Sequence, residues 1–187
     1  MIFKAVFFFL FISFKKTFHA YSHHWRTKTS YNPEGGLTAF DDNETMLATY
    51  WSTPFQELCV GMKVANDLRF MSINYTASSL YSSMENGTYY QATAAGRGKW
   101  MSLMSNLTLE PQCNLEGFNL QNQHGGNRTM WVRLGILGNN RQDCRSAYSV
   151  LGFGSNFWKW GSSCGNSMKV SKNENITATS MGYIFVR

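Results

Sequence analysis

The alternation of hydrophobic and polar positions predicts a β-hairpin in the first half of the chain. Residues Leu68–Tyr75 alternate apolar side chains such as Met71 and Ile73 with polar ones, which is the period of a half-buried strand. Cys59–Met62 carries a second apolar stretch, and Asn66-Asp67 between the two supplies residues that favour a turn. We therefore expect two adjacent strands here.

Two apolar runs later in the chain predict further strands, and two short segments predict helices. Met130–Leu137 has the pattern of a strand, and the unbroken apolar run Met181–Val186 is typical of a central strand buried on both faces. In Ser78–Met84 and Gly98–Met104 the apolar residues follow the period of a helix.

The rest of the chain predicts irregular structure. Tyr21–Thr53 is polar and rich in turn-forming residues, and we expect loops and short edge strands there. Asn119–Arg128 is expected to be a polar loop, and only 15% of all residues are charged. A length of 187 residues suits one domain. The expected fold is therefore α+β, with a mostly antiparallel sheet, a few short helices, long irregular loops and disulfide staples.

The first residues carry the pattern of a secretory signal. Lys4 precedes the apolar run Ala5–Phe14, which is too short to span a bilayer. We expect residues 1–20 to be a signal peptide, with Ala20 as the candidate cleavage position. Residues 21–187 would then form a single secreted domain without a membrane span.

The net charge does not indicate a nucleic-acid partner. The formal charge is +6, but Lys4, Lys15 and Lys16 lie in the predicted signal, and without them the basic excess is about +3. The other Lys and Arg residues are scattered singly, whereas phosphate binding needs a concentrated basic face. We expect no nucleic-acid binding.

Six Asn-X-Thr sequons support the secretory route. Chance would give roughly one in a chain of this Asn and Thr content, so we expect true glycan acceptors on surface loops. The acceptor positions are Asn43, Asn74, Asn86, Asn106, Asn127 and Asn175.

Four cysteines form an even set, which in a secreted chain predicts disulfides rather than a metal or catalytic role. Three pairings are possible. We favour Cys59 with Cys113 and Cys144 with Cys164, because each closes a local loop. In the chain-entropy model each such bridge stabilises the fold by about 3 to 4 kcal/mol.

The motifs do not indicate an enzyme. Gly161–Gly165 matches the G-x-S-x-G pattern of α/β-hydrolases, but no Asp follows Asp143 and no His follows His124, as that chain order requires. His23 and His24 lack a second pair of metal ligands at a recognisable spacing.

An aromatic cluster marks the candidate ligand site. Phe157, Trp158 and Trp160 lie in a loop rich in Gly, Ser and Asn between Cys144 and Cys164. Exposed rings stack on the apolar faces of sugars and lose little side-chain entropy on binding. The alternative is that one Trp packs into the core beneath the loop.

Six segments resemble a known group of proteins. They look like secreted cnidarian fibrinogen-like proteins, which include uncharacterised components of the coral skeletal organic matrix, and more distantly they are similar to intelectin-like lectins. The segments are TYWSTPFQELCVGMKV (Thr49–Val64), ASSLYSSMENGTYYQATAAGRGKWMSLM (Ala77–Met104), RLGILGNNRQDC (Arg133–Cys144), LGFG (Leu151–Gly154), SCGN (Ser163–Asn166) and MGYIFVR (Met181–Arg187).

The resemblance implies a fibrinogen-like domain and a calcium ion that holds glycan diols. It places Asn139, Asn140 and Asn166 near the ion, and Asp143 is the acid beside them. Relatives continue upstream with an opening strand that this chain is expected to lack. Residues 1–14 are then either a signal peptide or an artefact of the gene model in place of that strand.

Two function hypotheses follow from the sequence. The first is a secreted recognition glycoprotein, not an enzyme, that binds carbohydrate through the region Gly138–Asn166. The second is a structural component of an extracellular or skeletal organic matrix with no small-ligand site. Both imply glycans or extracellular matrix proteins as partners.

Overall fold

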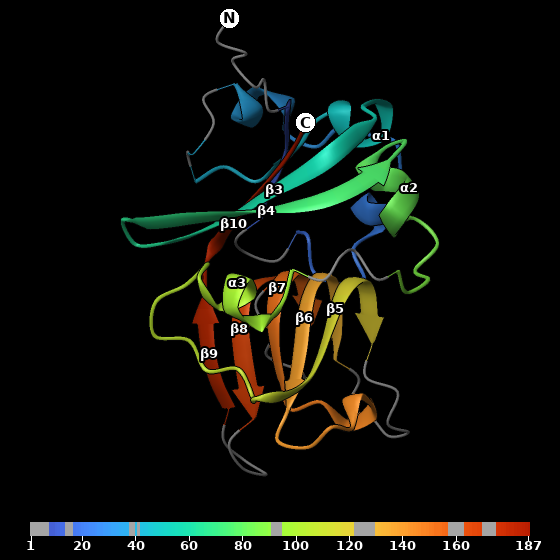
Figure 1. Ribbon diagram of the computed structural model, residues 1–187. Coiled ribbons are helices and arrows are strands. Elements are labelled where there is room, and N and C mark those ends of the chain that lie inside the picture. Colours follow the sequence, from blue (N-terminus) through green and yellow to red (C-terminus); the bar gives the residue numbers. More distant parts are fainter. Residues whose placement is uncertain are drawn as a thin grey trace, which may run out of the picture.

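Ten strands in two antiparallel sheets form the body of the protein, as the described part of the chain shows (Figure 1). The computed structural model describes residues 8–13, 17–37, 40, 42–90, 95–121, 130–156, 163–169 and 175–187. The α-helices in these ranges have only four or five residues. The prediction of mostly antiparallel sheets with a few short helices is confirmed.

The first sheet has the strand order β2-β1-β10-β3-β4. β3 and β4 are the predicted hairpin, and their turn is at Ala65 and Asn66, one residue earlier than expected. Ala65 has a φ of 52°, as two-residue hairpin turns require. The strands are β1 (Phe8–Ser13), β2 (Thr45–Met46), β3 (Phe55–Val64), β4 (Asp67–Ala77) and β10 (Met181–Val186).

The second sheet has the order β5-β6-β7-β8-β9, so each strand pairs with its neighbours in sequence. The loop predicted at Asn119–Arg128 is wrong at its start, because Asn119–Gln121 belong to β5; the rest of that segment lies outside the described residues. The strands are β5 (Gln112–Gln121), β6 (Trp131–Asn139), β7 (Ser149–Asn156), β8 (Cys164–Lys169) and β9 (Asn175–Thr179).

Two paired glycines let β6 and β7 approach closely. Gly135 is the register partner of Gly152. A Cβ on Gly135 would lie 2.3 Å from the carbonyl oxygen of Leu151, and a Cβ on Gly152 would lie 2.3 Å from that of Leu134. No side chain fits at this crossing, which explains why glycine interrupts the apolar pattern of both strands.

Short helices cover the ends of the sheets. In α2, which was predicted, Ser79 is the N-cap, and its Oγ accepts a hydrogen bond of 3.1 Å from the Ser82 amide. None of the helices in the described ranges is long and apolar enough to cross a bilayer. The helical segments are α1 (Thr49–Ser52), α2 (Leu80–Met84) and α3 (Arg97–Met101), and the 3-10 turns are η1 (His23–Arg26), η2 (Pro33–Gly36) and η3 (Cys144–Ser146).

The main core lies between the two sheets and joins them into one body. Both sheets and the short helices contribute fully buried apolar side chains, so neither sheet has a separate core on this side. Representative members are Leu58, Val60 and Ile184 from the first sheet, Leu134, Ile136 and Phe153 from the second, and Leu80, Met84 and Trp100 from α2 and α3.

β10 is buried on both faces, as its apolar sequence predicted. All six of its residues are buried, and it pairs with β1 on one edge and β3 on the other. Ile184 and Val186 join the main core, while Tyr183 and Phe185 belong to a cluster on the other face. The Phe40 ring covers that face, with its centroid 5.4 Å from that of Tyr183.

Residues before position 21 pack against the rest of the domain in the structure, and the expected boundary at residue 21 stays a prediction. Residues Phe8–Ser13, placed in the predicted signal, form β1 between β2 and β10, where an opening strand was expected to be absent. Phe18 and Ala20 are completely buried, and the Ala20 carbonyl accepts a 2.7 Å hydrogen bond from Arg133 Nε. Cleavage after Ala20 would remove these contacts. Secretion itself stays a prediction.

Candidate functional site

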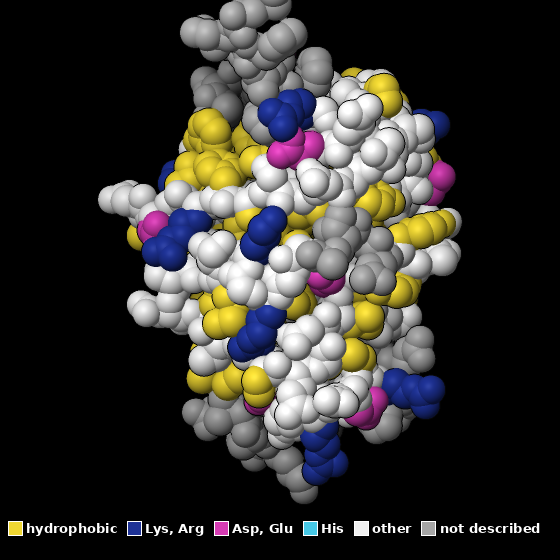
Figure 2. All heavy atoms as spheres, in the orientation of Figure 1, with side chains coloured by type: hydrophobic (Ala, Val, Ile, Leu, Met, Phe, Trp, Pro, Cys, Tyr) yellow, Lys and Arg dark blue, Asp and Glu magenta, His cyan; other side chains and the backbone are white. Residues whose placement is uncertain are grey.

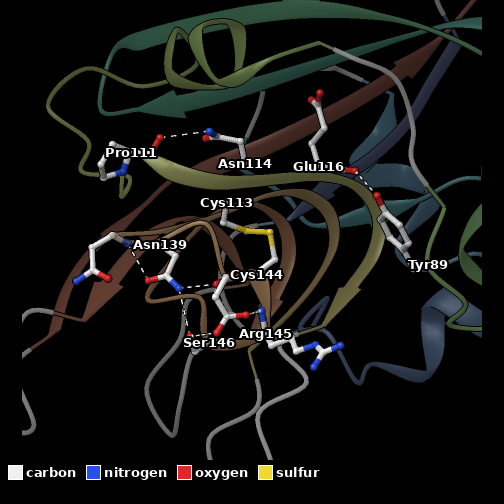
Figure 3. Close-up of a disulfide and its surroundings, with 11 residues drawn as sticks. Tyr89, Pro111, Cys113, Asn114, Glu116, Asn139, Cys144, Arg145 and Ser146 are labelled. Carbon is white, nitrogen blue, oxygen red and sulfur yellow. Dashed lines mark hydrogen bonds between the residues drawn. A yellow bond between two sulfur atoms is a disulfide. The ribbon is translucent and has the colours of Figure 1, made fainter.

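A single disulfide bond cross-links two segments at one end of the second sheet. It joins Cys113 near the start of β5 to Cys144 in η3, with 5.0 Å between the Cα atoms (Figure 3). Cys113 is paired with Gly138 at the end of β6, and Cys144 follows in the turn that leads to β7. The register of β5 on β6 therefore brings the two thiols together.

The predicted pairs Cys59–Cys113 and Cys144–Cys164 are wrong. Cys164 is paired with Phe153, whereas the turn that contains Cys144 ends at the other end of β7. Four residues of strand separate these positions, which is on the order of 13 Å, and bridged Cα atoms lie within about 7 Å. Cys59 lies in the first sheet, and both Cys59 and Cys164 are free.

The β6–β7 turn brings together three of the four residues predicted to hold calcium. Asn139 is fully buried, and its Nδ2 donates to the Asp143 carbonyl at 2.5 Å, while its Oδ1 accepts from the Asn140 amide at 2.7 Å. The Asp143 carboxylate accepts from the Arg145 amide at 2.9 Å and from Ser146 Oγ at 2.7 Å (Figure 3). These hydrogen bonds hold the turn in shape.

Asn166, the fourth predicted ligand, lies elsewhere. It is buried in β8, donates to the carbonyls of Thr108 and Val150 at 2.8 and 3.0 Å, and accepts from the Thr108 amide at 3.2 Å. Two strand spacings and three residues separate its position from Asn139, which is about 14 Å. Calcium ligands lie within about 2.6 Å of the ion, so the four residues do not fit one calcium site.

The predicted aromatic site Phe157, Trp158 and Trp160 lies outside the described residues. Its flanks are described: β7 ends at Asn156, which pairs on β6 with Trp131 at the start of that strand. The turn with Asn139 follows the other end of β6. The described flank of the aromatic segment and the turn with Asn139 therefore lie at opposite ends of the second sheet.

The sequon side chains that the structure describes are all at the surface. Asn43, Asn74, Asn86 and Asn106 are exposed. Asn127 lies outside the described residues, and of Asn175 only the backbone, at the start of β9, is described. Exposure is what glycan attachment requires.

A groove of about 620 Å³ lies where β3, β4 and the residue after β10 meet. β3 has a bulge between Phe55 and Glu57, and there the amides of Gln56 and Glu57 both donate to the Arg187 carbonyl, at 2.8 and 2.9 Å. The guanidinium of Arg187 forms an ion pair with the Glu57 carboxylate. We call this the Glu57–Arg187 groove; its lining is Pro54, Phe55, Gln56, Glu57, Asn74, Thr76, Ala77 and Arg187.

An aromatic surface patch lies on the outer face of the first sheet. Phe40 and Phe70 are 45% and 40% exposed, and their ring centroids are 5.9 Å apart. Tyr183 and Phe185 pack beneath them. Figure 2 shows hydrophobic side chains gathered beside the β3–β4 hairpin. Sequence patterns did not reveal this patch, because Phe40 belongs to a segment without periodicity.

Burial favours the protonated form of both free thiols, Cys59 and Cys164. Cys164 is fully buried, and burial raises its pKa to about 12, while its Sγ lies 3.3 Å from Ser180 Oγ. Burial also raises the pKa of Cys59. A thiolate is the nucleophile of cysteine enzymes, so these environments oppose such a role.

Two buried ionic side chains serve the packing of the domain. Trp100 Nε1 donates to the Glu116 carboxylate at 2.6 Å, which joins α3 to β5. Arg133 donates to the Met84 carbonyl at 3.1 Å and to Asn119 Oδ1 at 2.9 Å, in addition to Ala20. The rings of His23 and His24 are tilted against each other with their centroids 4.0 Å apart, and no cluster of three or more potential metal ligands occurs among the described residues.

The chain matches no protein-family model, no curated protein and no solved structure. The resemblance to fibrinogen-like and intelectin-like proteins therefore stays a prediction. What the described geometry defines is a disulfide-containing domain of two packed antiparallel sheets with surface sequons, an exposed aromatic patch and a polar groove.

Proposed function

We propose that this protein is a secreted, N-glycosylated recognition module without enzymatic activity, and that it binds glycans or extracellular matrix proteins. The exposure of Asn43, Asn74, Asn86 and Asn106 is the observation that carries the proposal. Acceptor sequons placed by chance would also fall in the core, whereas these four side chains are all accessible.

The disulfide and the thiol environments support the same proposal. A Cys113–Cys144 bond is typical of oxidising compartments and rare in the cytosol. The raised pKa of Cys59 and of Cys164 opposes a thiol nucleophile. Glu116 and Arg133, which are buried ionic groups of the kind found in active sites, are engaged in contacts that hold the fold.

Expression of the full chain in eukaryotic cells tests the proposal. The protein should enter the medium with glycans at the four described sequons, which glycopeptide mass spectrometry identifies site by site. A chain that stays inside the cell without glycans contradicts the proposal. The secreted protein is then applied to a glycan array with and without calcium, and failure to bind in both conditions removes the carbohydrate ligand.

A structural role in an extracellular matrix is the second candidate, and the aromatic patch favours it. Contiguous exposed apolar surface is typical of protein contacts, and Phe40 and Phe70 supply two adjacent rings. The double substitution Phe40→Ser and Phe70→Ser should release the protein from isolated matrix if this candidate holds. Leu37→Ser, at an even more exposed position, provides a control for the loss of an apolar side chain at the surface.

A further inference from the structure

Asn74 differs from the other described sequons because it lies in the wall of the Glu57–Arg187 groove. It is paired with Glu57 across the β3–β4 hairpin, and Thr76, the hydroxyl residue of the same sequon, also lines the groove. Tyr75 between them packs inward, with its ring centroid 4.9 Å from that of Phe118. A glycan on Asn74 would therefore emerge inside the groove.

The chemistry of the groove suits a sugar. Its polar groups include the Glu57 carboxylate, the Arg187 guanidinium and the Gln56 amide, which can accept from and donate to hydroxyl and acetamide groups. The side chains of Glu57 and Arg187 are 16% and 48% exposed, so both reach the groove surface. Pro54 adds apolar surface for the CH face of a sugar ring.

The size of the groove and the covalent attachment of the glycan to Asn74 both favour occupancy of the groove by that glycan. A volume of about 620 Å³ is within the range of small-ligand sites, about 300 to 1,000 Å³. A ligand joined by a short linker has an effective concentration on the order of millimolar, so even weak sugar contacts are made for much of the time. Asn43, Asn86 and Asn106 do not line this groove.

We propose that the N-glycan of Asn74 folds back into the Glu57–Arg187 groove and fills it with its proximal sugars. This inference rests on the proposed glycosylation of the secreted chain. The groove is then an internal glycan-binding site, and its natural ligand is carried by the strand that forms its wall.

Release of glycans from the native secreted protein by peptide-N-glycosidase tests this inference. Mass spectrometry follows the rate at each site, and Asn43, Asn86 and Asn106 are internal standards in the same molecule. The Asn74 glycan should be released about tenfold more slowly than the others, because it is bound in the groove for most of the time and the enzyme cannot reach it there. Arg187→Ala and, separately, Gln56→Ala should raise the Asn74 rate towards the standards, since each removes a groove side chain and keeps the backbone hydrogen bonds.

Arg69→Ala is the matched control, because Arg69 is an exposed, ion-paired arginine of the same hairpin that does not line the groove. It should leave the Asn74 rate unchanged. Equal release rates at all four sites of the wild type would overturn the inference and leave the proposed function intact. A slow Asn74 rate that neither groove variant changes would also overturn it. A secreted chain with no glycan at any of the four sites would refute the proposed function as well.

Discussion

Removal of the Cys113–Cys144 disulfide should destabilise the domain by about 3.7 kcal/mol. The bond closes a loop with a sequence separation of 31 residues, and the chain-entropy model gives this value for such a loop at 25 °C. That is a large share of the roughly 5 to 15 kcal/mol that hold a typical domain together. The paired ends of β5 and β6 should be the first part to separate, because the bond lies beside them.

Urea unfolding followed by tryptophan fluorescence measures this effect. The double substitution Cys113→Ala and Cys144→Ala is compared with the wild type, each with and without dithiothreitol. The wild type should lose stability on reduction and the double variant should not respond. Cys59→Ala, which breaks no disulfide, should change the unfolding free energy by less than about 1 kcal/mol. A urea midpoint of the wild type that does not change on reduction would refute the reasoning, as would peptide mapping that links Cys144 to Cys164.

Three further predictions concern buried groups. Burial raises the pKa of Cys164 in the folded protein to about 12 from an ordinary 9.0. Its neutral thiol therefore stabilises the fold below pH 9, and this contribution is lost as the pH rises towards 12. In urea titrations, the wild type should lose roughly 2 to 3 kcal/mol more unfolding free energy than Cys164→Ala between pH 8 and pH 11. Gly154→Ala should cost about 2 to 4 kcal/mol in calorimetry, because Gly154 has a φ of 62° and a Cβ there would lie 2.7 Å from Arg133 Cγ; a loss below 1 kcal/mol would contradict this. Glu116→Ala should cost about 2 to 4 kcal/mol and Glu116→Gln less, since only the amide keeps an acceptor for the buried Trp100 Nε1; equal losses in thermal unfolding would argue against the hydrogen bond.

Periodicity predicted the elements whose side chains follow it. β4 alternates and β10 is apolar throughout, and in α2 the buried side chains follow a helical period, so each was found. β7 and β8 were missed because their buried positions include Gly152, Ser149 and Asn166, whose polar groups or missing side chains break the apolar pattern. Hydrogen bonds such as that from the Glu110 amide to Ser149 Oγ are visible only in three dimensions.

The disulfide and the groove could not be located from the sequence without the three-dimensional arrangement of the strands. Without β5 and its register on β6, Cys113 could not be placed beside Cys144, and loop length alone favoured the wrong partners. The groove joins Glu57 and Arg187, which are 130 residues apart in sequence, and no local motif connects them. The sequons, in contrast, are defined by three adjacent residues, so Asn74 was identified as a sequon position although its groove was not.

The position of β10 in the centre of the first sheet has a consequence for synthesis on the ribosome. β1 and β3 are made early, but each has one edge that pairs with β10, which is made after the other described strands. The second sheet is a succession of local hairpins and can form first, whereas the edges of β1 and β3 that face β10 stay unpaired until β10 is made. Nascent chains are therefore most exposed to aggregation and to chaperones just before β10 emerges, and folding should be limited by this late, non-local step.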